Sequence, residues 1–111
     1  MTPGLWMAPF ACDKHSRLAA EHPSWVLSRR KDVPANSANC GKWFFGLDVT
    51  NPEVRRHIHD CIHTATATWG FRYLKLDFLY AAALRHSHDS YQDRSLTRAQ
   101  AMQVCPYLTL L

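Results

Sequence analysis

Several features that would assign a protein to a common class are missing from this 111-residue sequence. No apolar run approaches the ~20 residues of a membrane-spanning helix. The four cysteines stand far apart without a C-x-x-C pair, so no zinc ribbon or dithiol centre is expected, and the thiols are predicted to be isolated and mostly buried. The first residues show neither a basic segment nor a cleavage pattern, so no signal peptide is expected and a cytoplasmic location is favoured.

Charge is sparse and mostly unpatterned. The net charge is +4, but the basic residues are scattered apart from Arg29-Arg30-Lys31, which we interpret as a solvated loop face. A nucleic-acid surface needs a clustered basic patch, so no such partner is expected, and no membrane partner either. A hydrophobic fraction of 47% is ordinary for a globular protein, and the length allows one domain at most.

Two short segments have the pattern of buried strands. The apolar run Leu5–Phe10 is typical of a strand covered on both faces, and Pro9 should end it. In Tyr73–Phe78, alternate residues point to opposite faces, so Lys75 and Asp77 should share one face, about 6–7 Å apart along the strand. Leu74, Leu76 and Phe78 would line the other face. Charged groups on a buried strand must be paired or used, which makes this segment a candidate active-site strand.

A helix is predicted between these strands. Thr50 and Glu53 fit a capping box, and Pro52 is tolerated in the first turn. The helix should run to about Trp69 and end at Gly70. Its apolar stripe has helical spacing and comprises Val54, Ile58, Cys61, Ile62, Ala65 and Trp69. Strand, helix and strand together form a β/α unit of the α/β class.

The other segments carry weaker signals. Ser16 should cap a short helix over Arg17–His22 that Pro23 ends, and a further helix should cover Arg98–Val104. The polar segment Ser28–Asn39 is predicted to be a surface loop, and the apolar segment Lys42–Leu47 to be extended. We interpret the apolar tail 107–111 as the ending of a chain that is either cut or frame-shifted.

Four motifs follow one another along the chain: Gly4–Phe10, Glu21–Leu27, Leu47–Val54 and Trp69–Phe78. In their order and spacing they resemble the catalytic barrel of the α-galactosidases of glycoside hydrolase family 36, the melibiase type. The later segment Leu96–Ala101 fits the same pattern, and the resemblance covers nearly all of residues 4–104.

The resemblance implies a (β/α)8 TIM barrel. Gly4–Phe10 then corresponds to the third barrel strand and Tyr73–Phe78 to the fourth. Residues 1–111 would be a partial catalytic domain without a complete domain, since a barrel takes about 250 residues. The family's second catalytic carboxyl, the acid/base, lies on a later strand beyond this sequence.

The resemblance also implies roles for three residues. Asp77 corresponds to the catalytic nucleophile, Lys75 to a lysine that contacts sugar hydroxyls, and Trp6 to a wall of the galactose pocket. A retaining glycosidase needs an ionised carboxylate, and a nearby lysine favours that form by lowering the pKa of Asp77. No metal and no cofactor is implied.

Two functions remain open at this stage. The chain is either part of a retaining α-galactosidase acting on terminal α-linked galactose of small oligosaccharides, or a catalytically inactive fragment that at most binds sugars weakly. A chain without its acid/base is expected to be inactive alone.

Other polar residues have simpler interpretations. Asp48 is predicted to be a turn residue rather than a catalytic one. His59 and His63 are spaced i, i+4 like zinc ligands, but no third ligand is evident and they lie opposite the apolar stripe, so a solvated surface is favoured. A ligand role is not favoured for the loop cluster His86, His88 and Asp89.

Overall fold

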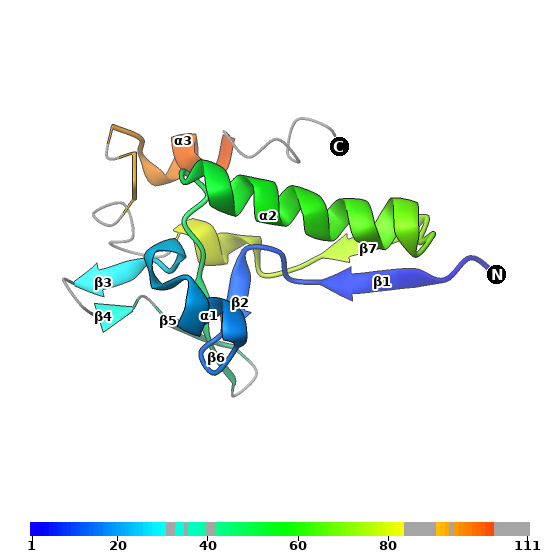
Figure 1. The fold of residues 1–111 in the computed structure, drawn as a ribbon, viewed down its shortest axis with the longest axis horizontal. Helices are drawn as coiled ribbons and strands as arrows, with labels where there is room; N and C mark the ends of the chain where they lie inside the picture. The colour runs from blue at the N-terminus through cyan, green and yellow to red at the C-terminus, as the bar shows by residue number, and fades with distance from the viewer. Residues whose placement is uncertain (31–32, 35, 40–41, 84–90, 94, 104–111) are drawn as a thin grey trace.

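The computed structural model describes residues 1–30, 33–34, 36–39, 42–83, 91–93 and 95–103. One long helix, α2 (Pro52–His63), runs along the molecule, with two parallel strands beside one end and several short elements near the other (Figure 1). Among the described residues, no helix combines the length and the hydropathy that a bilayer crossing requires.

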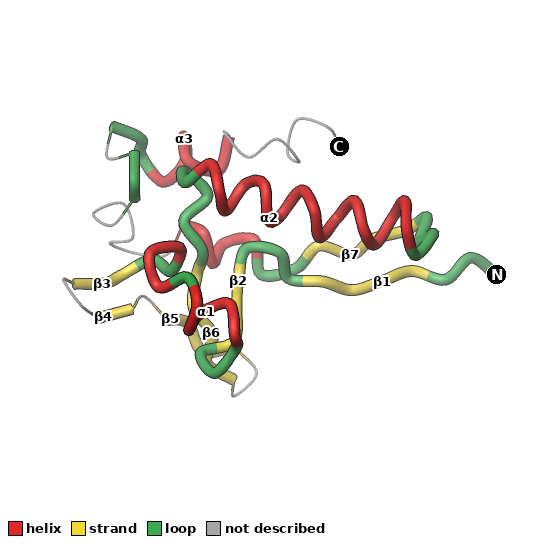
Figure 2. Tube along the Cα trace, in the orientation of Figure 1, coloured by secondary structure: helices red, strands yellow, loops and turns green. Residues whose placement is uncertain are grey.

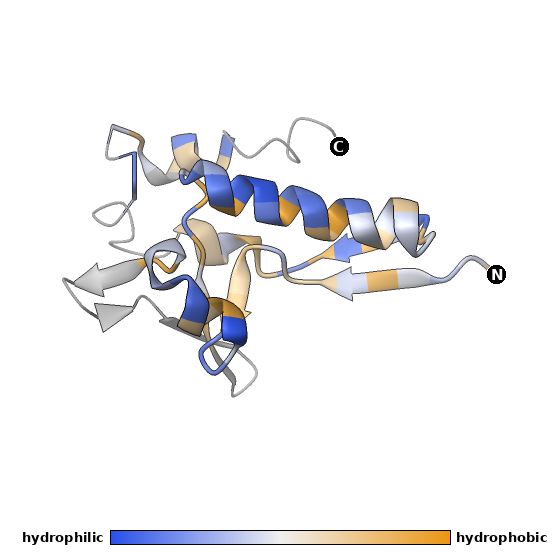
Figure 3. Ribbon diagram, viewed as in Figure 1, coloured by the Kyte–Doolittle hydropathy of each residue, from blue (hydrophilic) through white to orange (hydrophobic). Residues whose placement is uncertain are grey.

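The predicted β/α unit is present. β1 (Gly4–Met7) and β7 (Tyr73–Leu76) pair in parallel, with Trp6 opposite Lys75. Parallel neighbours need a crossover connection, and α2 lies in it, with its apolar side turned toward the strands (Figure 3). β1 ends before Pro9, as predicted.

The expectation that the first strand is covered on both faces is wrong for this chain. Along β1 and β7 the side chains alternate between exposed and half-buried. Trp6 is 51% exposed and Tyr73 66% exposed, so the face of the sheet that carries them is largely open. The half-buried residues of β7, Leu74 and Leu76, lie on the opposite face, as the alternation predicts.

The start of α2 differs from the predicted capping box. Asn51 is the N-cap, and its side chain accepts a hydrogen bond from the Glu53 N–H at 2.9 Å. Thr50 instead donates its hydroxyl to Asp48 Oδ1 at 2.6 Å, while Glu53 accepts a hydrogen bond from the Trp25 indole. The Thr50 hydroxyl is bound by Asp48, and the next residue, Asn51, acts as the cap in its place.

The end of α2 explains a second difference. After His63 the helix widens into a π-helical turn, Thr64–Thr68, and stops at Gly70, whose φ of +78° suits glycine. The wider turn shifts the residues that follow around the axis. Trp69 therefore leaves the apolar stripe and is 64% exposed, whereas Val54, Ile58 and Ala65 are buried as predicted.

The segment predicted to be a loop contains strands. β3 (Ser28–Arg30) pairs with β4 (Val33–Pro34), and β5 (Asn36–Asn39) pairs with β6 (Lys42–Gly46). β6 also pairs with β2 (Ala11–Asp13), which gives an antiparallel sheet in the order β2-β6-β5 (Figure 2). Strand pairing uses backbone groups, so a polar segment can extend beside an apolar partner.

Two short helices follow the predictions closely. α1 (Arg17–Glu21) is capped by Ser16, whose Oγ accepts from the Ala19 N–H, and a 3₁₀ turn (Pro23–Trp25) follows it. α3 (Arg98–Gln103) begins after Thr97, where Thr97 and Gln100 exchange hydrogen bonds of a capping box.

The core lies under the first half of α2, away from β1 and β7. Neither of these strands contributes a fully buried side chain. Free, half-buried Cys12 packs against the core, and free Cys61 is also half-buried; Cys40 and Cys105 lie outside the described residues. The core residues are Phe10, Trp25, Leu27, Leu47, Val49, Val54, Ile58, Ala82, Tyr91 and Ala101.

Candidate active site

The C-terminal ends of β1 and β7 bring the predicted site residues together. Trp6 and Lys75 are register partners, and the Asp77 N–H continues the pairing by donating to the Met7 carbonyl at 2.9 Å. Trp6, Lys75 and Asp77 therefore gather on the exposed face of the strand pair. The carboxyl end of parallel strands is where the sites of α/β barrels are built.

The Asp77 carboxylate is held at both oxygens. The Trp6 indole Nε1–H donates to Oδ2 at 3.0 Å, and the Phe78 N–H donates to Oδ1 at 2.9 Å. Lys75 Nζ lies 4.0 Å from Oδ2, at the limit of an ion pair. The Asp77 side chain is 36% exposed and that of Lys75 66% exposed, so both groups are open to a ligand.

These contacts favour the charged form of Asp77. The Trp6 hydrogen bond is the main cause that lowers the pKa of Asp77 below its ordinary value, and the Phe78 N–H adds to it. The Lys75 cation lowers the pKa of Asp77 least. The sequence identified the lysine as the group that keeps the carboxylate ionised, but two neutral donors contribute more.

Phe78 has an unusual backbone. Its φ is +54°, and it is the one non-glycine residue with positive φ in the described part of the chain. The left-handed conformation costs roughly 1–2 kcal/mol in a residue with a side chain. Such outliers persist where the surroundings enforce them, often at functional sites. Here the outlier is the same residue whose N–H donates to the Asp77 carboxylate.

Because of this left-handed turn, the Phe78 side chain does not lie where the sequence pattern predicted. The alternation of a regular strand placed Phe78 on the face opposite Asp77, but β7 ends at Leu76. The Phe78 ring instead meets the Trp6 ring edge-on, with centroids 5.7 Å apart, and stacks on Phe44 at 5.2 Å. Sequence reasoning missed this contact, because nothing in the local pattern marks a left-handed phenylalanine.

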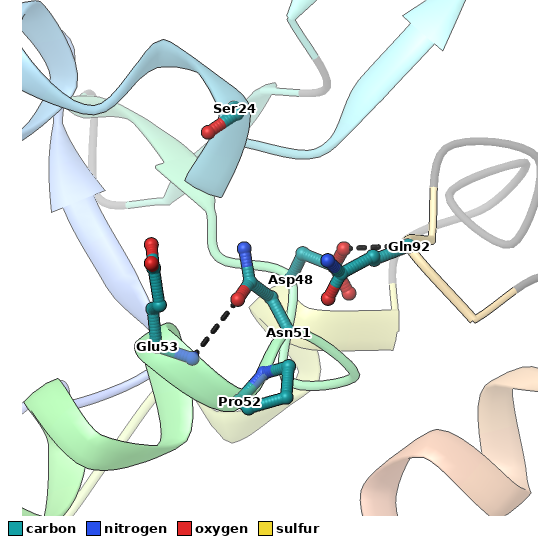
Figure 4. A pocket seen from close by; sticks show the side chains of 6 residues that line it. All are labelled: Ser24, Asp48, Asn51, Pro52, Glu53 and Gln92. Carbon is teal, nitrogen blue, oxygen red and sulfur yellow. Dashed lines mark hydrogen bonds between the residues drawn. The ribbon is translucent and has the colours of Figure 1, made fainter.

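A second polar cluster lies at the N-terminus of α2. Asp48, Asn51 and Glu53 border an open hollow of 540 Å³ with Ser24, Pro52 and Gln92 (Figure 4). Asp48 is 2% exposed and accepts from the Thr50 N–H, the Thr50 hydroxyl and the Gln92 N–H. Its oxygens hold two chain segments together, so the prediction that Asp48 is a turn residue is confirmed.

The histidines do not form a metal site within the described residues. His59 and His63 stack with ring centroids 5.9 Å apart and are exposed, as predicted. No group of three or more suitable ligands occurs in the described part of the chain. His57 lies 3.6 Å from Cys61 Sγ, and burial lowers the pKa of His57 and raises that of Cys61. The cluster His86, His88 and Asp89 lies outside the described residues.

Comparison with known proteins identifies relatives along nearly the whole chain. A family model described as Melibiase matches residues 1–109. The α-galactosidase TtGalA from Thermus thermophilus, solved with p-nitrophenyl α-D-galactopyranoside, is 36% identical over 95% of this chain, with a TM-score of 0.69. Its stachyose complex gives 34% identity over 95% and a TM-score of 0.68.

More distant structures extend this picture. The family 36 α-galactosidase AgaB from Geobacillus stearothermophilus is 26% identical over 66% of this chain and 10% of its own, with a TM-score of 0.53. The α-galactosidase from Lactobacillus brevis, 21% identical, shares the fold over 99% of this chain and 15% of its own, with a TM-score of 0.64. This chain spans 22% and 24% of the two Thermus chains.

Proposed function

The chain belongs to the melibiase family, and from that premise we propose that it supplies the nucleophile strand of a retaining α-galactosidase. The observation that carries the proposal is the Asp77 carboxylate, which ends β7 with both oxygens held by donors and beside a lysine. The substrate class is small oligosaccharides that end in α-linked galactose. Relatives solved with p-nitrophenyl α-D-galactopyranoside and stachyose support this class.

In the proposed reaction an Asp77 oxygen attacks the anomeric carbon of galactose. The bond from that carbon to the leaving oxygen breaks, and a second carboxyl group donates a proton to the leaving group. Water then hydrolyses the galactosyl–Asp77 ester, with the second carboxylate taking the proton from water. The attacking oxygen must be unprotonated, and the lowered pKa of Asp77 favours this form further.

Lys75 and Trp6 would bind the sugar. The Lys75 ammonium carries three N–H donors and is two-thirds exposed on the same face as Asp77, so it can donate to galactose hydroxyls. Trp6 is half-exposed while its Nε1–H is engaged by Asp77. Its ring can therefore offer an apolar surface to the C–H groups of the sugar.

We further propose that the chain acts within a longer polypeptide that completes the barrel. In this arrangement β1 and β7 are the third and fourth barrel strands, residues 1–111 form part of one catalytic domain, and the acid/base carboxyl comes from a later strand. The small share of each relative that the chain spans supports this arrangement. We call the protein in which residues 1–111 stand within a complete barrel the restored enzyme.

Covalent trapping tests the proposal. The restored enzyme is incubated with a fluorinated galactosyl fluoride, which forms the glycosyl–enzyme but releases it slowly. Peptide mass spectrometry should find one galactosyl adduct on Asp77. An adduct on another residue, or turnover with inversion of configuration, would refute the assignment. Asp60, an exposed carboxylate on α2, should stay unlabelled and serves as an internal control.

The competing function is an inactive fragment. The open face of β1 and β7 favours it for residues 1–111 alone, because Asp77 there has no opposite wall in the described structure. We therefore expect the 111-residue chain to show no α-galactosidase turnover and to associate through its strand edges. Turnover above a buffer blank by a monomer with a cooperative unfolding transition would contradict this expectation.

A further inference from the structure

We propose that Phe78 is a positioning residue for Asp77, and that Phe44 on β6 holds Phe78 in place. The proposal deepens the function proposed above and rests on it for its catalytic consequence. Its structural part stands independently, since it concerns how a carboxylate is oriented. The strand β6 lies outside the strand pair that forms the site. Under this proposal β6 contributes to the site through Phe44.

The first step concerns the backbone of Phe78. Its N–H donates to Asp77 Oδ1 at 2.9 Å and so holds one carboxylate oxygen directly. Its left-handed φ of +54° then turns the Phe78 side chain and the chain that follows away from the path of a regular strand. The backbone of Phe78 therefore both holds Oδ1 and decides where the Phe78 ring lies.

The second step concerns the ring of Phe78. It meets Trp6 edge-on, at an interplanar angle of 79° and a centroid distance of 5.7 Å. Trp6 in turn donates its Nε1–H to Asp77 Oδ2. Trp6 is half-exposed, and the ring contact with Phe78 together with this hydrogen bond helps to hold its indole in place. Phe78 thus acts on both carboxylate oxygens, one directly and one through Trp6.

The third step concerns the support of Phe78. The Phe44 ring stacks on it with centroids 5.2 Å apart and planes at 26°. Phe44 itself is 9% exposed and lies within the paired strand β6, so it is a firm base. The chain after Phe78 also packs closely on β6. The gap at Gly46 is so small that an added Cβ would collide with the Ala81 carbonyl.

The consequence is that packing from β6, outside the strand pair, helps to set the orientation of the nucleophile. Trimming the Phe44 ring should let the Phe78 and Trp6 rings rotate and weaken the Trp6 hydrogen bond to Asp77. The pKa of Asp77 should then rise toward its ordinary value, because that bond is the largest cause that lowers it. A residue that served only stability would lower the amount of folded protein without moving this pKa.

The Phe44→Leu variant tests the inference, with Phe45→Leu as the matched control. Phe45 neighbours Phe44 on β6, and its side chain points to the opposite face of the sheet. The probe is the NMR resonance of the Trp6 indole N–H in the 111-residue chain, which the Trp6→Phe variant assigns. If the isolated chain associates, the same resonance is measured in the restored enzyme. Its titration midpoint reports the ionisation of Asp77 whether or not Asp77 is the nucleophile.

We expect Phe44→Leu to shift the indole proton upfield and to raise its titration midpoint, while Phe45→Leu leaves both unchanged. In the restored enzyme the acid limb of kcat/KM should move to higher pH, with kcat/KM at neutral pH falling about tenfold, since small misplacements of reacting groups are costly. An unchanged midpoint in folded Phe44→Leu overturns the inference, whatever the activity.

A second variant covers the case in which Phe44→Leu fails to fold. Phe78→Gly keeps the left-handed turn and its N–H but removes the ring, so the Trp6 resonance should still move upfield. No movement in this variant would also overturn the inference. Suppose that the restored enzyme with Asp77→Ala retains turnover, while Phe44→Leu shifts the Trp6 resonance as expected. The proposed function then fails, but the inference that Phe78 positions Asp77 stands.

Discussion

Asp48 and Asp77 show how differently the two ends of this molecule use a carboxylate. Asp48 is 2% exposed, and its oxygens accept three hydrogen bonds from Thr50 and Gln92, two segments far apart in the sequence. Asp77 is 36% exposed at its side chain and accepts from its chain neighbour and from Trp6. One aspartate joins segments of the core, whereas the other is oriented but left open.

The difference follows from where the core lies. The buried residues gather under the first half of α2, beside Asp48, and none of them comes from β1 or β7. A buried carboxylate is retained only when its oxygens are satisfied, and three of the roughly four acceptor positions of Asp48 are already used within the chain. Asp77, at the edge of the packed region, keeps unsatisfied lone pairs that can face a substrate.

Replacing Asp77 should produce the largest effect and separate the two aspartates by activity. In the restored enzyme, Asp77→Asn removes the attacking oxyanion, so we expect turnover of a nitrophenyl α-galactoside to fall by roughly 10³-fold or more. The thermal midpoint should change little, because the site is partly exposed. Asp60→Asn on α2 is the control and should retain full activity. Activity of Asp77→Asn within tenfold of the parent would place the nucleophile elsewhere.

Replacing Asp48 should have the opposite consequence, since we expect a loss of stability as the primary effect. Asp48→Asn turns one oxygen into an NH₂ donor that faces the N–H or hydroxyl donors of Gln92 or Thr50. A buried donor without an acceptor costs about 1–3 kcal/mol, and more where a charged partner was lost, so we expect destabilisation of about 3 kcal/mol. Thermal unfolding of the restored enzyme measures the loss. A stable Asp48→Asn protein with lost turnover would mean that Asp48, too, belongs to the active site.

Replacing Lys75 should lower activity, as replacing Asp77 does, but less strongly. Lys75→Met keeps the length of the side chain but removes its charge and its donors to the sugar, so we expect kcat/KM to fall about 10²-fold, equivalent to about 2.7 kcal/mol. Because Lys75 lowers the pKa of Asp77 least, the acid limb of the pH profile should move little. A large upward shift of that limb with unchanged KM would show that Lys75 acts on the nucleophile rather than on the sugar.

The parts of the structure that sequence patterns predicted are those decided locally. Ser16 caps α1, Gly70 ends the helix region and Pro9 follows the end of β1, and each depends on residues within one turn. The parallel pairing of β1 and β7 also followed, since a strand–helix–strand pattern has few alternatives. These features place Trp6, Lys75 and Asp77 on one face without further information.

The parts that sequence patterns missed depend on distant partners. The polar segment Asn36–Asn39 is a strand only because β6 pairs with it. Phe78 leaves the strand alternation because Phe44 and Trp6 receive its ring. Thr50 gave up the capping position because Asp48 and the Asp93 N–H bind its hydroxyl. In each case a contact across the chain overrode a local preference.

The smallest expected effect comes from Asn51, the cap of α2, which is 7% exposed and lies close to Asp48 in the sequence. Asn51→Ala removes the side-chain acceptor for the Glu53 N–H, and losing an N-cap typically costs about 1 kcal/mol. Asn51→Ser keeps an acceptor at the same position and should restore most of the stability, which distinguishes capping from simple packing. Thermal unfolding of the restored enzyme is the measurement, and kcat should stay unchanged in both variants because Asp77 lies at the other end of the connection. If Asn51→Ala and Asn51→Ser unfold at the same temperature, Asn51 does not stabilise α2 as its cap. In that case a firmly capped start of α2, the helix between Asp48 and Asp77 in the sequence, could not be part of the reason why one aspartate is fixed in the core and the other is open.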